Sequence, residues 1–246
     1  MKKILAVLVT AALAIPAFGT QISLPGDPII GGQIVSGSTT FDEGTDGFNI
    51  PGNNWPPGEA PELAIDGTSS KYLNFGQQGT GILLSPSGGQ SVLDQITAWT
   101  ANDAVERDPT SYIIWGSNDP AVHASNFNTN GTQDQVDLSS FSVVNGGPLN
   151  LPDSGPSQSR NEGGLPIEDA RFFTTTVFDN VDAHCTYIVM FPDVKDPTTA
   201  NSMQIAEIEL HGEFTGVACP VVPEPSTSLL LGLTTLLIIP ALRRRK

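Results

Sequence analysis

Residues 171–178 read Arg-Phe-Phe-Thr-Thr-Thr-Val-Phe, and this stretch has the composition of a β-strand, rich in aromatic and β-branched residues. Successive side chains of a strand point to opposite faces of its sheet. One face would therefore carry Phe172, Thr174, Thr176 and Phe178. The other face would carry Phe173, Thr175 and Val177. The stretch predicts one strand of a packed β-sheet.

Three further segments have the same character, and each is bounded by clusters of Gly, Pro, Asn or Asp. They are residues 111–116 (SYIIWG), 186–191 (TYIVMF) and 203–210 (MQIAEIEL). The 25 glycines, the 20 prolines and a charged fraction of 15% also favour short strands joined by turns. The polar, Gly-rich stretch 122–166 is expected to hold one or two strands around residues 141–144 and otherwise long loops. We predict an all-β domain over residues 28–214.

The charge of this central region is strongly negative. The net charge is −15, and six of the eleven basic residues lie at the two ends of the chain. Residues 4–242 therefore carry 5 − 26 = −21. Such a surface repels phosphate backbones, so we expect no nucleic-acid partner. It is compatible with divalent cations, with neutral glycans or simply with solubility.

The N-terminus has the three parts of a secretory signal peptide. Lys2 and Lys3 precede the apolar run 4–14, and small residues follow at Ala17 and Gly19. We expect a signal peptide over residues 1–19 that is cleaved after Gly19. The protein is therefore predicted to be exported.

The C-terminus begins with a Pro/Val linker over residues 215–227, which contains Pro223-Glu224-Pro225. An apolar segment, too short for an ordinary membrane span, and a basic cluster follow within residues 228–246. Together these parts resemble the PEP-CTERM sorting signal of Gram-negative bacteria. The resemblance implies an exosortase-type enzyme at the inner membrane as a partner, at least transient membrane anchoring through a transmembrane helix, and a final place in the cell envelope or outside the cell. The alternative is an ordinary C-terminal anchor.

Cys185 and Cys219 are the only cysteines. In an oxidising compartment they could form a disulfide that ties the last strands to the segment before the tail. The alternative is two unpaired thiols, one buried and one in a linker.

Three central segments resemble the discoidin, or coagulation factor 5/8 type C, family of galactose-binding-like domains. They are residues 58–67 (GEAPELAIDG) with 71–75 (KYLNF), residues 100–119, which end in a Gly-Ser-Asn-Asp turn, and residues 204–212 (QIAEIELHG). The resemblance implies an eight-stranded jelly-roll β-sandwich of two antiparallel sheets, with loops at its ends. The sequence departs from the family pattern after Asp119, where Pro120 follows and a nearby tryptophan is missing.

Many members of this family carry a structural calcium ion beside the first motif. By resemblance, the ligands here would be Asp66, Thr68, Ser70, the carbonyl of Ala206 and the carboxylate of Glu207. Calcium binds six to eight hard oxygen ligands, so carboxylates and carbonyls in a tight loop suit it. Alternatively, Asp66 only caps its turn and Glu207 is a solvated strand residue.

Carbohydrate modules hold sugars by stacking an exposed aromatic ring on the apolar face of a pyranose, while polar groups fix the hydroxyls. The candidates are the aromatic residues Trp55, Tyr72 and Phe75, with Asn54, Arg107 and Asp108 as polar partners. Tyr72 is the weakest candidate, because the family's aromatic at this position usually belongs to the core. Arg107 and Asp108 could instead form an ion pair that fixes a turn. Trp99 and Trp115 lie in strand patterns and are expected in the core.

Enzymatic activity is the weaker interpretation. The three histidines, His123, His184 and His211, lack the spacing of a zinc site, and the nucleophile-elbow, phosphate-loop and dinucleotide motifs are absent. We expect a non-catalytic surface or extracellular-matrix protein that binds carbohydrate, such as an exopolysaccharide. The alternatives are a purely structural displayed protein and, third, a small hydrolase.

Overall fold

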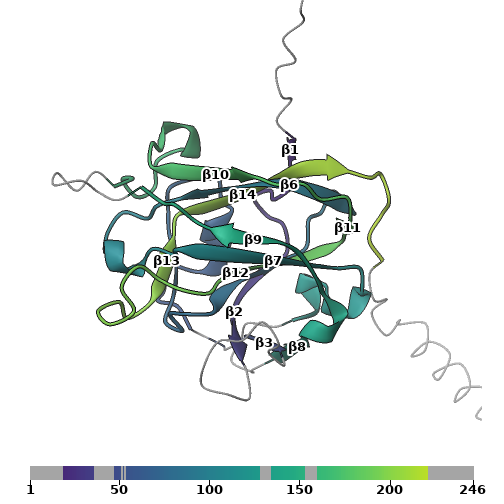
Figure 1. Ribbon diagram of the computed structural model, residues 1–246, viewed down its shortest axis with the longest axis horizontal. Coiled ribbons are helices and arrows are strands. Elements are labelled where there is room, and N and C mark those ends of the chain that lie inside the picture. Colours follow the sequence, from purple (N-terminus) through teal and green to yellow (C-terminus); the bar gives the residue numbers. More distant parts are fainter. Residues whose placement is uncertain are drawn as a thin grey trace, which may run out of the picture.

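Two antiparallel β-sheets face each other in the computed structural model, as Figure 1 shows. The smaller sheet has the order β1 (Thr20–Gln21), β14 (Glu207–Phe214), β6 (Ser91–Trp99) and β10 (Phe173–Val177), and β11 (Ala183–His184) also pairs with β6. The larger sheet has the order β8 (Asp134–Asp137), β3 (Gly47–Ile50), β2 (Ile29–Val35), β5 (Thr80–Leu84), β12 (Thr186–Phe191), β7 (Ser111–Ser117) and β9 (Ser142–Pro148). A separate pair joins β4 (Tyr72–Asn74) to β13 (Met203–Ile205). The predicted all-β sandwich is confirmed.

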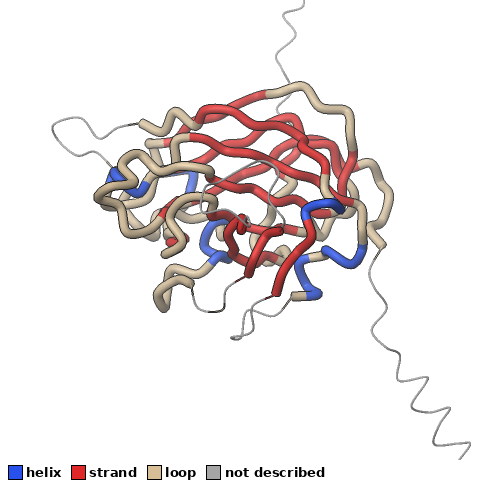
Figure 2. Tube along the Cα trace, turned by 60° about the horizontal axis from the view of Figure 1, so that its bottom comes forward, coloured by secondary structure: helices blue, strands red, loops and turns tan. Residues whose placement is uncertain are grey.

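In the part of the chain that the structure describes, helical structure is confined to short 3₁₀ turns in the connections, outside the two layers of strands (Figure 2). They are η1 (Pro61–Ala64), η2 (Val105–Arg107), η3 (Pro120–Val122), η4 (Ala124–Asn126), η5 (Leu138–Ser140) and η6 (Ile167–Asp169). Within the described residues, no helix is long and apolar enough to cross a bilayer.

The structure describes residues 19–35, 47–50, 52, 54–127, 134–152 and 160–220. The expected signal peptide, apart from Gly19, lies outside these residues. The same holds for Pro223-Glu224-Pro225 and for the apolar tail.

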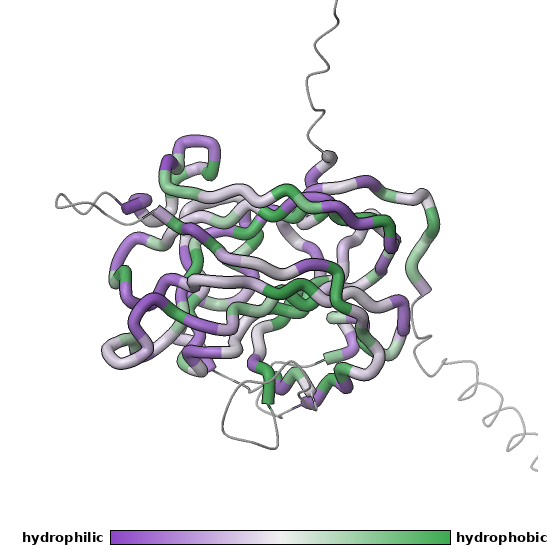
Figure 3. The backbone as a smooth tube through the Cα atoms, viewed as in Figure 1, coloured by the Kyte–Doolittle hydropathy of each residue, from purple (hydrophilic) through white to green (hydrophobic). Residues whose placement is uncertain are grey.

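The main core lies between the two sheets. Ile208 and Leu210 of β14 are fully buried, whereas Glu209 and His211 of the same strand are only partly buried, as expected for alternating faces. They pack against inward-facing residues of the larger sheet, namely Ile82, Leu84, Ile114, Tyr187, Val189 and Phe191. Burying each side chain of this size stabilises the fold by roughly 1.5–3 kcal/mol. In Figure 3 the hydrophobic segments lie mainly along these strands, and many of the connecting loops are hydrophilic.

A second apolar cluster covers the outer face of the larger sheet. All six residues of β12 are buried, because Ile188 and Met190 pack on this outer side against residues that follow β7 in the sequence. The cover comes from η3, η4 and β8, with Val122, Ala124 and Val136 as its buried side chains. Among the described residues of the stretch 122–166, the one or two expected strands are present as β8 and β9. The same stretch also supplies part of this apolar cluster, which was not expected.

The strand predicted from residues 171–178 is present as β10. Its residues pair with β6 from Phe173 opposite Trp99 to Val177 opposite Gln95. Thr174 and Thr176 are partly buried, whereas Phe173, Thr175 and Val177 are exposed, so the two faces differ as the pattern indicated.

The folded region extends beyond the expected bounds of 28–214. β1 starts at Thr20, and the Gln90 N–H donates to the Val217 carbonyl at 2.9 Å. A disulfide joins Cys185 to Cys219, with their Cα atoms 5.5 Å apart. The first residues of the expected linker are therefore part of the domain.

Candidate functional site

A tight loop brings four of the expected calcium ligands together. Gly67 has φ +74°, a conformation that favours glycine, and it lets the chain turn back after Asp66. Asp66 Oδ1 accepts a 2.8 Å hydrogen bond from the Thr68 N–H, and Thr68 Oγ1 donates to Ser70 Oγ at 2.8 Å. Glu207 Oε1 reaches the same loop and accepts from the Gly67 N–H at 3.2 Å.

The environment of Glu207 is unfavourable for an isolated charge. Its side chain is fully buried, and Oε2 has no hydrogen-bond partner among the described residues. Burial, with the nearby Asp66 carboxylate as a smaller cause, raises the pKa of Glu207 to about 9. Glu207 is not a solvated strand residue, and a cation beside Oε2 would satisfy both the charge and the orphaned oxygen. Among the described residues, no three acidic, His or Cys side chains are placed to hold one metal ion together. Hydroxyl and backbone oxygens would therefore have to complete the coordination shell.

The aromatic residues expected to stack on sugar have different environments. Tyr72 is fully buried, and its hydroxyl donates to the Gly81 carbonyl and accepts from Asn74 Nδ2. Burial raises its pKa. Tyr72 is thus a core residue, as the alternative interpretation held, and it cannot stack on a ligand.

Trp55 is partly buried and packs edge-on against Tyr72, with ring centroids 6.2 Å apart. Asn54 lies beside it and donates from Nδ2 to Asn74 Oδ1 at 2.5 Å. Phe75 is half exposed, and its N–H donates to the Asn54 carbonyl. Of the expected stacking residues, only Phe75 therefore presents much of its ring to solvent.

Asp108 forms a buried ion-pair network rather than a ligand contact or a pair with Arg107. It is fully buried and receives two hydrogen bonds from Arg160, of 2.6 Å to Oδ2 and 2.5 Å to Oδ1. Lys195 Nζ lies 3.4 Å from Oδ2. The expected pair with Arg107 is replaced by partners that are distant in sequence, Arg160 and Lys195. Arg107 is partly buried, and its Nε is buried without a hydrogen-bond partner among the described residues.

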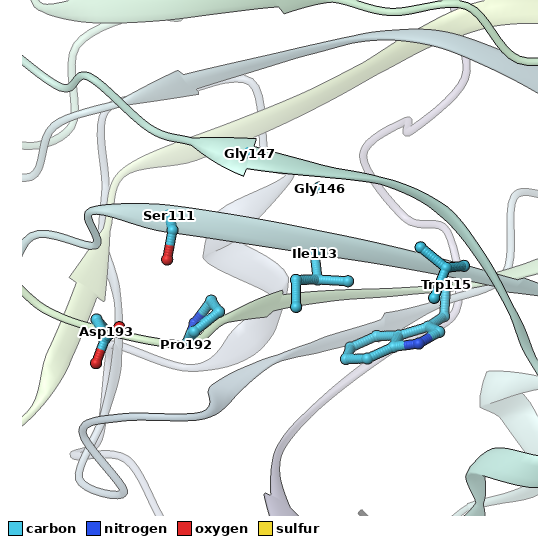
Figure 4. A pocket seen from close by; sticks show the side chains of 8 residues that line it. Ser111, Ile113, Trp115, Gly146, Gly147, Pro192 and Asp193 are labelled. Atoms are coloured by element: carbon cyan, nitrogen blue, oxygen red, sulfur yellow. The ribbon is translucent and has the colours of Figure 1, made fainter. Parts of the chain in front are cut away.

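An open pocket lies on the outer face of β7 and β9 (Figure 4). Its volume is about 480 Å³, and its lining consists of Ser111, Ile113, Trp115, Val143, Gly146, Gly147, Pro192 and Asp193. The β7 residues alternate along one strand and so share a face. In Figure 4 Asp193 and Pro192 lie at one end of the pocket, Trp115 lies at the other, and Ile113 lies between them.

Gly146 of β9 keeps one wall of this pocket open. A Cβ atom on Gly146 would lie 3.2 Å from the Tyr112 carbonyl oxygen and 3.4 Å from Ile113 Cγ1, so a larger residue would crowd this wall. Val143 is 64% exposed and adds an apolar surface. Asp193 is exposed, and its Oδ1 accepts a 2.7 Å hydrogen bond from Gln78 Nε2, which holds the carboxylate at the rim.

This pocket was not predicted from the sequence. The alternation of Ser111, Ile113 and Trp115 and the Gly146-Gly147 pair are visible there, but their adjacency depends on how β9 pairs with β7. That pairing shifts register between Ile114 and Trp115, which no local pattern indicates.

Comparison with known proteins yields structural neighbours only. No protein-family profile and no curated protein matches the sequence. One solved neighbour is CBM32-3 from a family 31 glycoside hydrolase of Clostridium perfringens, at 16% identity, covering 65% of this chain and 87% of that chain with a TM-score of 0.43. A second, a CBM32 module from the same organism in complex with GalNAc-β-1,3-galactose, has 13% identity, covers 78% and 100%, and has a TM-score of 0.44. A family 32 module from C. perfringens NanJ, in complex with galactose, has 13% identity, covers 64% and 88%, and has a TM-score of 0.37.

Proposed function

We propose that this protein is a non-catalytic, exported module that binds a neutral carbohydrate in the pocket on β7 and β9. The observation that carries the proposal is the pocket itself, which combines an apolar floor with polar groups at one end. A volume of about 480 Å³ lies in the range of small-ligand sites. The pocket thus has room for one or two sugar rings.

The chemistry of the lining suits a pyranose. Ile113, Val143 and Pro192 can contact the C–H groups of a ring, while the Ser111 hydroxyl and the Asp193 carboxylate can hydrogen-bond its hydroxyls. Asp193 and the excess of acidic residues elsewhere disfavour uronic or sialic acids, because like charges repel. A neutral sugar is therefore the ligand class that fits best.

The proposal is tested by screening the full-length chain, purified in mild detergent, on a glycan array and titrating the best ligand. Asp193→Asn should weaken binding about tenfold, since a hydrogen bond to a charged group contributes roughly 1.5–3 kcal/mol. Val143→Ser should weaken it several-fold by removing apolar contact. The matched control is Val181→Ser, because Val181 is 88% exposed and does not line the pocket.

The outcomes also separate the rival functions. Retention of no glycan would favour a purely structural displayed protein. Turnover of chromogenic glycosides or esters would favour a small hydrolase. Equal binding by Val143→Ser and Val181→Ser would place the sugar elsewhere, with Phe75, Trp55 and Asn54 as the next candidates.

We also propose that the protein is exported and displayed outside the cytoplasm. The basic and apolar N-terminus would direct secretion, and the Pro223-Glu224-Pro225 tail would be handled by an exosortase-type enzyme, which leaves the module in the envelope or the matrix. The Cys185–Cys219 disulfide supports an oxidising compartment. Mass spectrometry of the mature protein from its own cells would test both processing events.

We also propose a structural calcium ion held by Asp66, Thr68, Ser70, the carbonyl of Ala206 and Glu207. The support is the orphaned, buried Glu207 Oε2 beside the Asp66 loop. Calcium would tie the start of β14 to this loop, which is a stabilising role.

A further inference from the structure

Strand β10 forms an open edge of the smaller sheet. It pairs with β6 on one side, and no described strand pairs with its other side. The Thr100 N–H donates to the Phe172 carbonyl, and the Phe178 N–H donates to the Asp94 carbonyl. Because alternate residues of an antiparallel strand direct their backbone groups to the same side, Thr174 and Thr176 also face β6. The N–H and C=O groups of Phe173, Thr175 and Val177 therefore point away from the sheet.

This edge lacks the features that normally prevent pairing. Exposed edges are usually protected by charged residues, proline or bulges. β10 contains none of them, and its Phe173 and Val177 are 46% and 71% exposed. Such a neutral, partly apolar strand contrasts with a chain that has 26 acidic residues.

We propose that β10 pairs with β10 of a second copy of this chain, antiparallel and centred on Thr175. In this register the outward backbone groups of Thr175 meet those of the partner's Thr175, and those of Phe173 meet those of the partner's Val177. Three such pairs form, and each exchanges two backbone hydrogen bonds. The contact is self-complementary, as a two-fold dimer requires, and it joins the smaller sheets of the two copies.

The side chains match in the same register. Phe173 lies opposite the partner's Val177, and Thr174 lies opposite the partner's Thr176; aromatic with β-branched and Thr with Thr are favourable cross-strand pairs. Arg171 lies opposite the partner's Asp179. Both of these flanking residues are exposed. One segment thus places apolar, hydroxyl and oppositely charged partners together.

The charge pair is diagnostic because it cannot form within one copy. Arg171 and Asp179 flank the two ends of β10, about 26 Å apart at roughly 3.3 Å per residue. Only a second copy in the antiparallel register brings them into contact. The ion pair between Arg171 and the partner's Asp179 is exposed and contributes little binding free energy, so it fixes the register of the two strands more than the affinity of the dimer.

The test is the mass of the full-length chain in mild detergent, measured by sedimentation from 1 to about 100 µM. We expect the wild type to dimerise. Thr175→Pro should be monomeric, because the N–H that it removes points away from β6 and serves only the contact between copies. Its melting temperature should fall only slightly, through loss of the 3.0 Å contact between the Thr175 and Thr97 hydroxyls. Arg171→Asp should weaken the dimer, and the double variant Arg171→Asp/Asp179→Arg should restore it.

Three results would overturn the proposal. They are a wild type that stays monomeric over the whole range, a dimer that survives both Thr175→Pro and Arg171→Asp, and a double variant that remains as weak as Arg171→Asp. A dimer that persists in every variant would assign association to another part of the chain. If Thr175→Pro fails to fold, Arg171→Asp and the double variant Arg171→Asp/Asp179→Arg still test the proposed dimer, because both side chains lie outside β10.

Discussion

Replacing Asp108 by alanine separates a structural role of this residue from a role in ligand binding. The variant leaves the Arg160 guanidinium, whose side chain is only 6% exposed, without its carboxylate partner. Removing one member of a buried ion pair costs about 3–5 kcal/mol, because the remaining charge stays buried and unpaired. Lys195 and Gln204 also lose contacts at 3.4 Å. For a domain of this size, the loss corresponds to a decrease in Tm of about 6–20 °C.

The measurement is urea and thermal unfolding of the wild type, Asp108→Ala and a matched control. The control is Asp103→Ala, whose carboxylate is 48% exposed and pairs with Lys71 at 2.8 Å. Exposed pairs contribute about 1 kcal/mol or less, so this variant should unfold nearly like the wild type. Asp108→Ala with normal stability and lost glycan binding would refute the reasoning and return Asp108 to the ligand site.

Three further predictions concern the metal, the disulfide and pH. Calcium should raise the unfolding midpoint of the wild type but not that of Glu207→Gln, and a wild-type midpoint that is the same with calcium and with chelator would eliminate the ion. The double variant Cys185→Ser/Cys219→Ser should lose about 4 kcal/mol, as expected for a bridge that spans 34 residues; an unchanged free energy of unfolding would contradict this. His211 Nε2 lies 3.0 Å from Glu209 Oε2, and this interaction raises the pKa of His211 above its usual value near 6.5. Its stabilising effect should be complete below that value and should disappear as the pH rises through the folded-state pKa, so His211→Gln should be more destabilising at about pH 5 than at about pH 9. An equal loss of unfolding free energy in His211→Gln at both pH values would contradict a stabilising pair between His211 and Glu209.

Local patterns predicted the strands well because side-chain alternation is a property of consecutive residues. The segment 171–178 became β10, and Trp99 and Trp115 are buried, with exposures of 7% and 5%. The proximity of the Asp66 loop to Glu207, about 140 residues away, came from the family resemblance and not from a local pattern.

Features that depend on distant partners were not predictable in this way. Asp108 forms an ion pair with Arg160, 52 residues away in the sequence, and no local sequence pattern predicts this pair. Part of the second core on the outer face of the larger sheet comes from the stretch 122–166, whose polar, Gly-rich composition indicated mainly loops. The pocket forms because β9 is shifted in register against β7 and because Pro192 and Asp193, which follow β12, lie beside these strands.

A crystal structure of the protein with its best array ligand tests the proposed binding function most directly. We predict density for a sugar ring against Ile113 and Val143, with a hydroxyl group hydrogen-bonded to Asp193. Density at the Phe75 loop, or a crystal soaked at saturating sugar with an empty pocket, would contradict the assignment of this pocket as the carbohydrate site.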